Sequence, residues 1–434
     1  MTRRRETSNQ KNDWLEPSAG NGLLDRRAFL TGGTFAAAGI VAASAGGAYA
    51  ATTGDAAPDW MTTPGAGFSG YGSPSPHEAS VQRGILLPWG DVAEDSGVSF
   101  TPINHLRGTI TPNGLHFERH HGGIPAIDPA AHKLLIHGLV DRPLKFSTDA
   151  LLRYPMVSRI CFIECSGNSF FNTFDEPRQD SAHMIHGLIS GTEWTGIPVA
   201  ALLDEAGVDP RAKWCLFEST DAAGLTRSIP LEKLYDDALI ALYQNGERLR
   251  PEQGYPMRLL LPGWEGNSQV KWLRRMKLVE APMETRQETS KYTDTQPDGI
   301  SRQFTFTMAA KSVITQPSLG LTMQAPGLYE VSGIAWSGHG RIVKVEVSAE
   351  GGESWAEADL QGPDLPKALT RFRIPWRWQG GRARLQSRAT DEFGNTQPLR
   401  SDWMPEYSAG NIYHYNAIQT WDVAEDGSIS NVYV

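Results

Sequence analysis

Two regions of the chain differ in how their apolar residues are arranged. Between residues 106 and 302, short apolar runs typical of strands are interspersed with two short helices that begin at Ser147 or Thr148 and at Pro198. The helices are predicted to end at Tyr154 and Glu205, and the predicted strands are Lys133–Gly138, Arg159–Glu164, Met257–Leu261 and Val270–Val279. We therefore predict an α+β fold with one mixed domain over residues 106–302.

From Gln303 onward, strand-like runs follow one another at regular spacing, and few helical periods occur. The runs are Tyr329–Trp336, Ile342–Ala349, Thr370–Trp378 and Arg382–Thr390, with glycine-containing turns between them. This arrangement predicts an immunoglobulin-like β-sandwich over residues 303–406. The tail, residues 407–434, is aromatic, and we expect it to pack on one of the two domains.

The N-terminal region has the pattern of an export signal. Arg26-Arg27 precede a weakly apolar, Gly- and Ala-rich run over 32–47, which ends in Ala48-Tyr49-Ala50, a small-x-small cleavage pattern. Residues 1–50 are therefore predicted to be a twin-arginine signal peptide that directs the protein to the periplasm; the alternative is an anchor that stays attached. No later stretch is long and apolar enough to span a bilayer. Residues 51–105, rich in Gly, Pro and Ser near their start, are expected to form an extended arm.

Composition excludes some functions and leaves others open. The net charge of −9 argues against a nucleic-acid binder. Gly65–Gly70 reads G-x-G-x-x-G, but no strand precedes it and Pro74 follows it, so we reject a dinucleotide site. Only three cysteines occur, with no C-x-x-C-H haem motif, so at least one thiol is unpaired. Whether Cys161 and Cys215 form a disulfide is left open.

Four clusters of residues could carry chemistry. Cys165 follows a predicted strand and precedes Ser166-Gly167-Asn168, and strand ends are where cofactor groups meet the chain; the alternative is a buried structural cysteine or a disulfide with Cys161 or Cys215. The other three clusters have cations or a carboxylate suited to an anionic, hydrogen-bonding ligand, and each could alone be an ordinary surface patch or turn. They are Phe117–His121, Arg258 with Gly266–Trp272, and Glu218–Asp221.

Taken together, these clusters resemble the sulfite oxidase family of molybdenum enzymes over roughly residues 105–403. Five ordered motifs carry the resemblance: F-x-R-x-H, C-x-G-N, G-[FY]-P-x-R, V-K-W-L-R-R and W-S-G-x-G-R. They correspond to Phe117–His121, Cys165–Asn168, Gly254–Arg258, Val270–Arg275 and Trp336–Arg341. The family's second domain is an immunoglobulin-like dimerisation domain, so the resemblance implies a homodimer formed through residues 303–406.

The resemblance also implies roles for individual residues. Cys165 would be the thiolate ligand of molybdenum and Arg119 would line the oxyanion pocket beside it, so these two are the expected catalytic residues. The expected substrate pocket consists of Arg119, Phe170, Leu225 and Arg341. The residues expected to hold the pterin and its phosphate are Phe117, Arg119, His121, Asp221, Gln253, Arg258, Gln269 and Lys271.

Three positions depart from the sulfite oxidase pattern. Phe170, Asp180 and Leu225 stand where a pocket arginine, lysine and tyrosine are expected, so the pocket loses positive charge. Within the family, the runs Leu115–Pro125, Pro251–Arg275 and Tyr413–Trp421 are most similar to the molybdenum subunit of sulfane dehydrogenase from the bacterial Sox system.

That similarity implies oxidation of a sulfane sulfur held on a cysteine of a carrier protein, by oxo transfer from molybdenum. The chain has no haem motif, so a separate electron acceptor is required, and the resemblance implies that this acceptor is a c-type cytochrome subunit. A periplasmic sulfite dehydrogenase of the same family is the main alternative. A cofactor-free exported binding subunit is a third hypothesis from another class.

Overall fold

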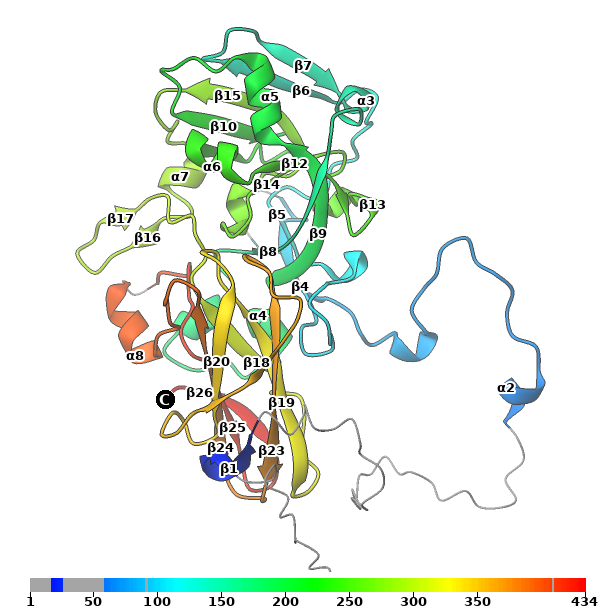
Figure 1. The fold of residues 1–434 in the computed structure, drawn as a ribbon, viewed down its shortest axis with the longest axis vertical. Helices are drawn as coiled ribbons and strands as arrows, with labels where there is room; N and C mark the ends of the chain where they lie inside the picture. The colour runs from blue at the N-terminus through cyan, green and yellow to red at the C-terminus, as the bar shows by residue number, and fades with distance from the viewer. Residues whose placement is uncertain (1–16, 26–57, 90–92, 408–409) are drawn as a thin grey trace, which may run out of the picture.

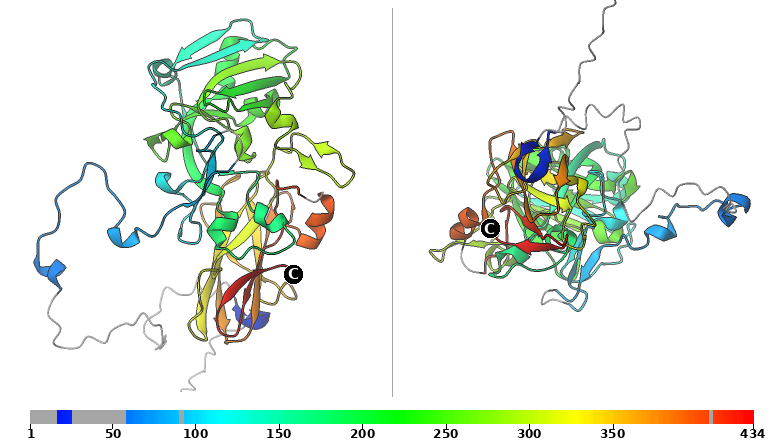
Figure 2. Two further views of the ribbon diagram at one scale, coloured as in Figure 1. Left: turned by 180° about the vertical axis from the view of Figure 1, so that it is seen from behind. Right: turned by 90° about the horizontal axis from the view of Figure 1, so that it is seen from below.

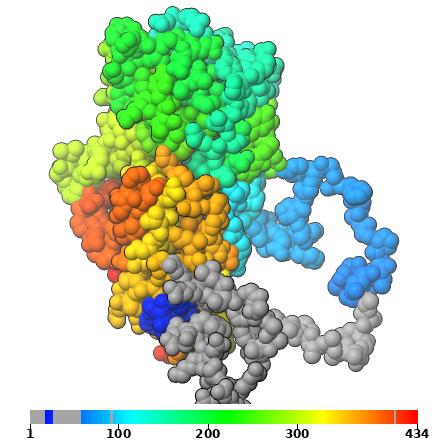
Figure 3. All heavy atoms as spheres, in the orientation of Figure 1, coloured from blue at the N-terminus to red at the C-terminus, as the bar shows by residue number. Residues whose placement is uncertain are grey.

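The computed structural model describes residues 17–25, 58–89, 93–407 and 410–434, and the twin-arginine pair and the predicted cleavage site lie outside these ranges. Two bodies stack along the long axis of the molecule, with the mixed domain above the β-sandwich in Figure 1. Residues 58–83, which include α2 (Asp59–Thr62) and η4 (Pro76–Glu78), run outside both bodies (Figures 1 and 3).

A five-stranded sheet forms the outer half of the first domain. Its order is β11-β10-β15-β6-β7, and only β15 and β6 run parallel. The helices α3 (Thr148–Leu151), α5 (Val199–Ala206) and α6 (Leu231–Asp236) accompany it, and apolar residues of the sheet and of α5 share one core. The strands are β6 (Lys133–Gly138), β7 (Leu144–Ser147), β10 (Trp214–Ser219), β11 (Thr226–Pro230) and β15 (Leu273–Val279).

A second sheet brings the predicted site residues toward the centre of the molecule. It has the order β13-β12-β9-β8, and β14 also pairs with β12. The long strand β8 ends at Glu164, so that Cys165 is the first residue after it. The strands are β8 (Val157–Glu164), β9 (Ile189–Pro198), β12 (Leu239–Gln244), β13 (Glu247–Arg248) and β14 (Arg258–Leu260).

The boundary predicted for the N-terminal arm is corrected by a third, small sheet. The strands β3 (Gly84–Leu86), β4 (Gly97–Phe100) and β5 (Glu118–His120) pair in that order, and β4 is buried throughout. Residues 84–89 and 93–105 therefore belong to the first domain. The sequence did not predict β4 because its residues, Gly-Val-Ser-Phe, include two small residues that are not apolar, so the strand has no continuous apolar run.

The second domain is a sandwich of two antiparallel sheets (Figures 1 and 2). One sheet contains β18 (Lys311–Gln316), β19 (Gly327–Trp336), β22 (Asp359–Gln361) and β23 (Thr370–Trp378). The other contains β20 (Ile342–Ser348), β21 (Ala356–Glu357), β24 (Ala383–Asp391), β25 (Thr420–Val423) and β26 (Ile429–Val432). The predicted end of this domain at 406 is therefore too early, because β25 and β26 of the tail complete the second sheet.

Several shorter elements join these sheets. They are β16 (Asp294–Thr295), β17 (Ser301–Arg302), α4 (Ala182–His186), α7 (Arg286–Thr289), α8 (Arg400–Trp403), and the one-turn helices η5 (Asn113–Leu115), η6 (Phe170–Thr173), η7 (Pro251–Gln253), η8 (Gly266–Ser268) and η9 (Met404–Glu406). A common apolar cluster crosses the domain boundary, where Phe162 and Ile189 of the first domain meet Val313, Ile334 and Trp336 of the second. In the part of the chain that is described, no helix is long and apolar enough to cross a membrane.

One observed element was not predicted at all. Residues 17–25, which precede the twin-arginine pair, form β1 (Pro17–Ala19), η2 (Gly20–Gly22) and β2 (Leu23–Leu24). β2 pairs with β23, so this short hairpin extends the first sheet of the sandwich. It lies at the end of the sandwich that is far from the first domain (Figures 1 and 2).

Candidate functional site

A cavity opens beside the end of β8 and collects residues from six separate parts of the chain. Most of the residues predicted from the sequence line it. They are Phe117, Arg119, His121, Cys165, Asp221, Leu225, Gln253, Arg258, Gln269 and Lys271. Asn267 and Trp272 of the predicted cluster Gly266–Trp272, to which no role was assigned, line the same cavity, and so do His116 and Tyr292, which were not predicted.

Cys165 is held at the cavity by a tight turn. Its backbone N–H donates to the Leu188 carbonyl oxygen at 2.9 Å, and its own carbonyl accepts from the Asn168 N–H at 2.8 Å. The side chain of Asn168 donates to Glu164 at 2.9 Å and accepts from the Leu188 N–H at 3.1 Å. The left-handed residue of this turn is Ser169, with a φ of 71°, so Gly167 is not needed for a left-handed backbone there.

The thiol of Cys165 is partly buried and lies in a mixed electrostatic environment. Burial raises its pKa, while the backbone at Gly167 and the charge of Arg119 act in the opposite direction. The other two thiols are fully buried: Cys161 packs in the core beside the cavity, and Cys215 in the core of the outer sheet. Burial raises the pKa of Cys161 to about 12. All three cysteines are free, so Cys161 and Cys215 do not form a disulfide.

Two cations of the cavity hydrogen-bond only to neutral groups. Arg258 is 3% exposed and donates to the carbonyl oxygens of Gln253 at 3.1 Å and Gln269 at 3.2 Å. Burial lowers its pKa to about 9. Lys271 donates through Nζ to the carbonyl oxygens of Arg119 at 3.2 Å and Glu252 at 3.0 Å. Burial, and then the charge of Arg258, lower the pKa of Lys271 well below its usual range. Enclosed cations without an ion-pair partner favour an anionic ligand, because an anion offsets their desolvation.

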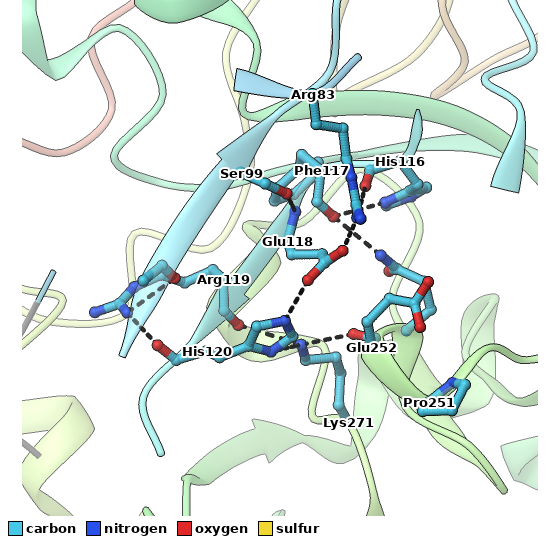
Figure 4. A network of polar contacts seen from close by, with 12 residues as sticks. Arg83, Ser99, His116, Phe117, Glu118, Arg119, His120, Pro251, Glu252 and Lys271 are labelled. Carbon is cyan, nitrogen blue, oxygen red and sulfur yellow. Dashed lines mark hydrogen bonds and ion pairs between the residues drawn. The ribbon is translucent and has the colours of Figure 1, made fainter. Parts of the chain in front are cut away.

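A chain of polar contacts fixes the position of Lys271 (Figure 4). Glu118 lies between Arg83, with which it forms an ion pair, and His120 Nε2, 2.7 Å away. The Nδ1 of His120 is 2.9 Å from Lys271 Nζ. Burial and the neighbouring charges of Lys271 and Arg119 lower the pKa of His120 to about 2, so its ring is neutral. The ring therefore donates from Nε2 to Glu118 and accepts from Lys271 at Nδ1.

Arg119, in β5, is held by backbone groups of the small sheet formed by β3, β4 and β5 and of the segment between β3 and β4. Its guanidinium donates to the Trp89 carbonyl oxygen at 3.1 Å and to the carbonyl of His120, while the residue also lines the cavity. Because the backbone carbonyl groups hold the guanidinium, its positive charge is fixed before any ligand arrives. Of the charged side chains that line the cavity among the described residues, the cations are Arg119, Arg258 and Lys271, and Asp221 is the acid.

A tyrosine that the sequence did not indicate, Tyr292, also lines the cavity. The hydroxyl of Tyr292 is 2.7 Å from His121 Nε2, and its ring lies 5.4 Å from that of Tyr413 in the tail. Burial, followed by the charge of Arg119, lowers the pKa of His121 to about 3, so this ring is also neutral. No motif surrounds Tyr292, and only the fold brings it to the cavity, so the sequence held no signal for it.

Three predicted positions differ from their expected places. Phe170 does not line the cavity: it packs in the adjoining aromatic core, with its ring centroid 4.9 Å from that of Trp89. Arg341 does not line it either, because its guanidinium pairs with Glu392 at 3.1 Å and with Asp364 at 3.4 Å on the sandwich. Asp180 also lies away from the cavity walls and is paired with Arg178 at 3.3 Å. Of the four residues predicted to form the substrate pocket, Arg119 and Leu225 line this cavity, whereas Phe170 and Arg341 do not.

The far side of the Cys165 turn contains paired charges. Glu164 accepts from Lys311 Nζ at 3.3 Å and from Trp336 Nε1 at 2.6 Å, both of which come from the sandwich. Glu265 pairs with Arg227 at 2.9 Å and with His414 of the tail at 3.4 Å. These contacts attach the second domain and the tail to the turn that carries Cys165.

The residues of the cavity fit a cofactor of defined chemistry. The Nε of Arg258, Oδ1 of Asn267 and Nε2 of His116 are buried without a hydrogen-bond partner, which suits a ligand that offers both donors and acceptors. Cys165 offers one soft thiolate ligand, and the enclosed cations match an anionic group. No group of three or more His, Cys, Asp or Glu side chains among the described residues is arranged to hold a metal ion. The thiol, the enclosed cations and the unpartnered polar atoms fit an anionic, polar ligand.

Comparison with known proteins leads to the same chemistry. Residues 121–287 match the family described as "Oxidoreductase molybdopterin binding domain", and residues 302–421 match the "Mo-co oxidoreductase dimerisation domain". The chain is 30% identical to mitochondrial sulfite oxidase of Mus musculus over 340 residues, which are 72% of this chain and 62% of that protein. It is also 30% identical to a nitrate reductase [NADH] of Solanum lycopersicum over 360 residues. It thus spans between about two fifths and three fifths of the length of these curated relatives.

A solved structure covers more of the molecule. The crystal structure of the sulfane dehydrogenase SoxCD from Paracoccus pantotrophus superposes with a TM-score of 0.84 at 43% identity, over 87% of this chain and 97% of the matched chain. The superposition covers both domains, so the fold of each domain and their arrangement are those seen in that crystal structure. The chain belongs to the sulfite oxidase family and is a molybdopterin-dependent oxidoreductase.

Proposed function

We propose that this protein oxidises a sulfane sulfur that is carried on a cysteine of a partner protein, and that it passes the electrons to a c-type cytochrome. The observation that carries the proposal is the 43% identity to a sulfane dehydrogenase over nearly the whole of that chain. The composition of the cavity wall supports it independently.

The cavity residues have distinct parts in this proposal. Cys165 supplies the thiolate ligand of molybdenum, while Arg258 and Lys271 hold the anionic groups of molybdopterin. Asp221 and Gln253 accept or donate hydrogen bonds along the polar edge of the pterin. When bound, the cofactor supplies a molybdenum centre that transfers an oxygen atom to sulfur and takes up two electrons. The chain's own contribution is position and a fixed electrostatic field.

Little fixed positive charge remains in the cavity wall for a substrate. Arg119 is the lining cation that this proposal does not assign to the cofactor, and Arg341 does not line the cavity. Free sulfite is a small dianion whose desolvation needs several cations, whereas a sulfane on a carrier arm gains binding energy from contacts between the two proteins. This wall therefore favours the tethered substrate.

The proposed assembly and location follow from the same comparison and from the N-terminal pattern. We propose a homodimer formed through the β-sandwich, a cytochrome subunit near the first domain, and a periplasmic location reached by the twin-arginine route. The matched dimerisation domain supports the first of these. Replacing Arg26 and Arg27 by lysine should stop periplasmic accumulation; normal periplasmic yield of the double variant would contradict that route.

The substrate is tested by steady-state assays of purified holoenzyme with its cytochrome partner. One assay uses a carrier protein persulfidated on its cysteine, the other uses free sulfite at equal concentration, and the unmodified carrier is the control. We expect kcat/KM to be at least about a hundredfold higher for the persulfidated carrier, a difference of about 3 kcal/mol in transition-state binding. Efficient oxidation of sulfite with no turnover of the carrier would contradict the proposal.

A periplasmic sulfite dehydrogenase is the second candidate. It is favoured by the 30% identity to sulfite oxidase and by Arg119 at the cavity, where that guanidinium can bind a sulfite oxygen. The two candidates share the cofactor and differ only in the substrate, so the same pair of assays separates them.

A further inference from the structure

The segment Pro17–Leu24 is packed against the β-sandwich although it lies inside the predicted export signal. Strand β23 pairs with β19 along one edge, and on the other edge β22 pairs only with Arg371–Arg373. Leu23 pairs with Trp376 on that second edge, where β22 has ended. The segment thus occupies a stretch of open strand edge, as peptides do when they extend a sheet.

The hydrogen bonds of this segment come from three separate parts of the second domain. Asn21 Nδ2 donates to the carbonyl oxygens of Ala349 at 3.0 Å and Arg382 at 3.1 Å, and the Asn21 carbonyl accepts from Trp376 Nε1 at 2.9 Å. The Gly20 N–H donates to Ser354 Oγ at 2.9 Å. These partners lie side by side only when β20, β23 and β24 have assembled, so the docking surface exists only on the folded sandwich.

The apolar contacts and the close backbone approach between this segment and the β-sandwich are equally specific. Leu23 and Leu24 are 0% and 2% exposed, and Leu23 belongs to the core of the sandwich. Gly22 has a φ of +88°, and a Cβ there would lie 2.1 Å from the Arg377 carbonyl oxygen. Asn21 also has a left-handed backbone, with a φ of 55°. A chance contact would not require two left-handed residues and two buried leucines in one short segment.

We propose that Pro17–Leu24 is a docking segment of the export signal, which binds the edge of β23 in the folded precursor and leaves when residues 1–50 are removed. Leu24 is two positions before Arg26 in the sequence, so the docked segment directly precedes the twin-arginine pair along the chain. The claim that the contact is temporary rests on the proposed export; the contact itself does not.

The first test uses a synthetic peptide of residues 17–25, which contains no tryptophan, and protein that begins at Ala51. Binding is followed by tryptophan fluorescence, because Trp376 is at the surface that the peptide covers, and by calorimetry. We expect saturable 1:1 binding, and we expect Gly22→Ala in the peptide to weaken it at least about tenfold. Ser18→Ala is the matched control, because Ser18 is exposed in the hairpin and should leave binding unchanged. Absence of binding by the natural peptide, or equal binding by Gly22→Ala, would overturn the proposal.

The second test compares the full precursor with the protein that begins at Ala51 by hydrogen exchange. Amides of Ile374–Trp378 should exchange more slowly in the precursor, and Leu23→Asp in the precursor should remove that protection. Equal exchange in precursor and shortened protein would overturn the docking. The mass of the periplasmic protein decides whether the contact is temporary: a mass that retains residues 17–25 would overturn that part. Failure of export in the Arg26→Lys, Arg27→Lys variant bears on the proposed route and leaves both docking tests unaffected.

Discussion

Two groups of buried charge surround the Cys165 turn, and they are built in opposite ways. Behind the turn, Glu164 and Glu265 each have an ion-pair partner from a distant part of the chain. In front of it, Arg258 and Lys271 make hydrogen bonds only to neutral acceptors. Paired charges are satisfied by the protein alone and hold its parts together, whereas enclosed cations without an ion partner are arranged for something that the protein binds.

The largest effect is expected from breaking the pair behind the turn. Lys311→Met leaves the buried Glu164 carboxylate without its cation, and removing one partner of a buried pair costs about 3–5 kcal/mol. We expect this loss in the free energy of unfolding, measured by denaturant titration, and we expect it to be the same with and without cofactor. The double variant Lys311→Met, Glu164→Gln is the control and should regain part of the stability. A loss seen only in the loaded protein would contradict the structural role.

The next largest effect is expected at Lys271 in the cavity. Unlike the effect of Lys311→Met, it should appear only when the cofactor is bound. Lys271→Met should lower the affinity for molybdopterin by about 2–5 kcal/mol, because it removes a cation that pairs with a buried anion. The melting temperatures of loaded protein and of protein made in a molybdopterin-deficient host are compared for the wild type and the variant. The cofactor should raise the melting temperature of the wild type more than that of Lys271→Met. An equal rise in both would show that Lys271 does not hold the ligand.

A smaller effect, in the paired region, depends on pH. Burial lowers the pKa of His414, but its contacts with Glu265 and Asp294 outweigh burial, so the net pKa is raised. The His414 pair therefore contributes its full stability below the unfolded pKa of about 6.5, and this contribution is lost as pH rises through the folded pKa. The difference in unfolding free energy between wild type and His414→Gln should be greatest at low pH and should shrink as pH rises. A difference that grows with pH would contradict the assignment.

The smallest effect is expected at the contact chain that orients Lys271. Glu118→Gln keeps a hydrogen-bond acceptor for His120 but removes the charge that fixes its ring. Cofactor release should quicken by about fivefold, equivalent to about 1 kcal/mol; the variant also loses the ion pair with Arg83, so unfolding of the cofactor-free protein is measured separately. The released pterin is followed by its fluorescence after oxidation. A rate of cofactor release equal to that of the wild type would show that the charge of Glu118 is not needed to orient the His120 ring.

The same contrast explains what could be predicted from the sequence. The cavity residues lie in short motifs, so Arg119, Cys165, Arg258 and Lys271 could be assigned to one site from the sequence alone. The paired residues could not, because Lys311 is 147 positions from its partner and no motif links the two.

The errors have a related cause. A position in a motif does not determine where its side chain points. The left-handed Ser169 precedes Phe170, which packs into the aromatic core, and nearby carboxylates capture Arg341. Tyr292 reaches the cavity from a loop between the domains, and its approach depends on the whole fold.

The central claim is that Cys165 binds the molybdenum of the cofactor in this cavity. X-ray absorption at the molybdenum edge counts the sulfur atoms bound to the metal, and it is applied to the wild type and to Cys165→Ser at matched molybdenum content. The fully buried Cys161 is the matched control, as Cys161→Ser leaves the proposed ligand intact. We expect Cys165→Ser to have one sulfur neighbour fewer and to lose turnover, with Cys161→Ser unchanged in sulfur count. The same sulfur count in wild type and Cys165→Ser would contradict the account.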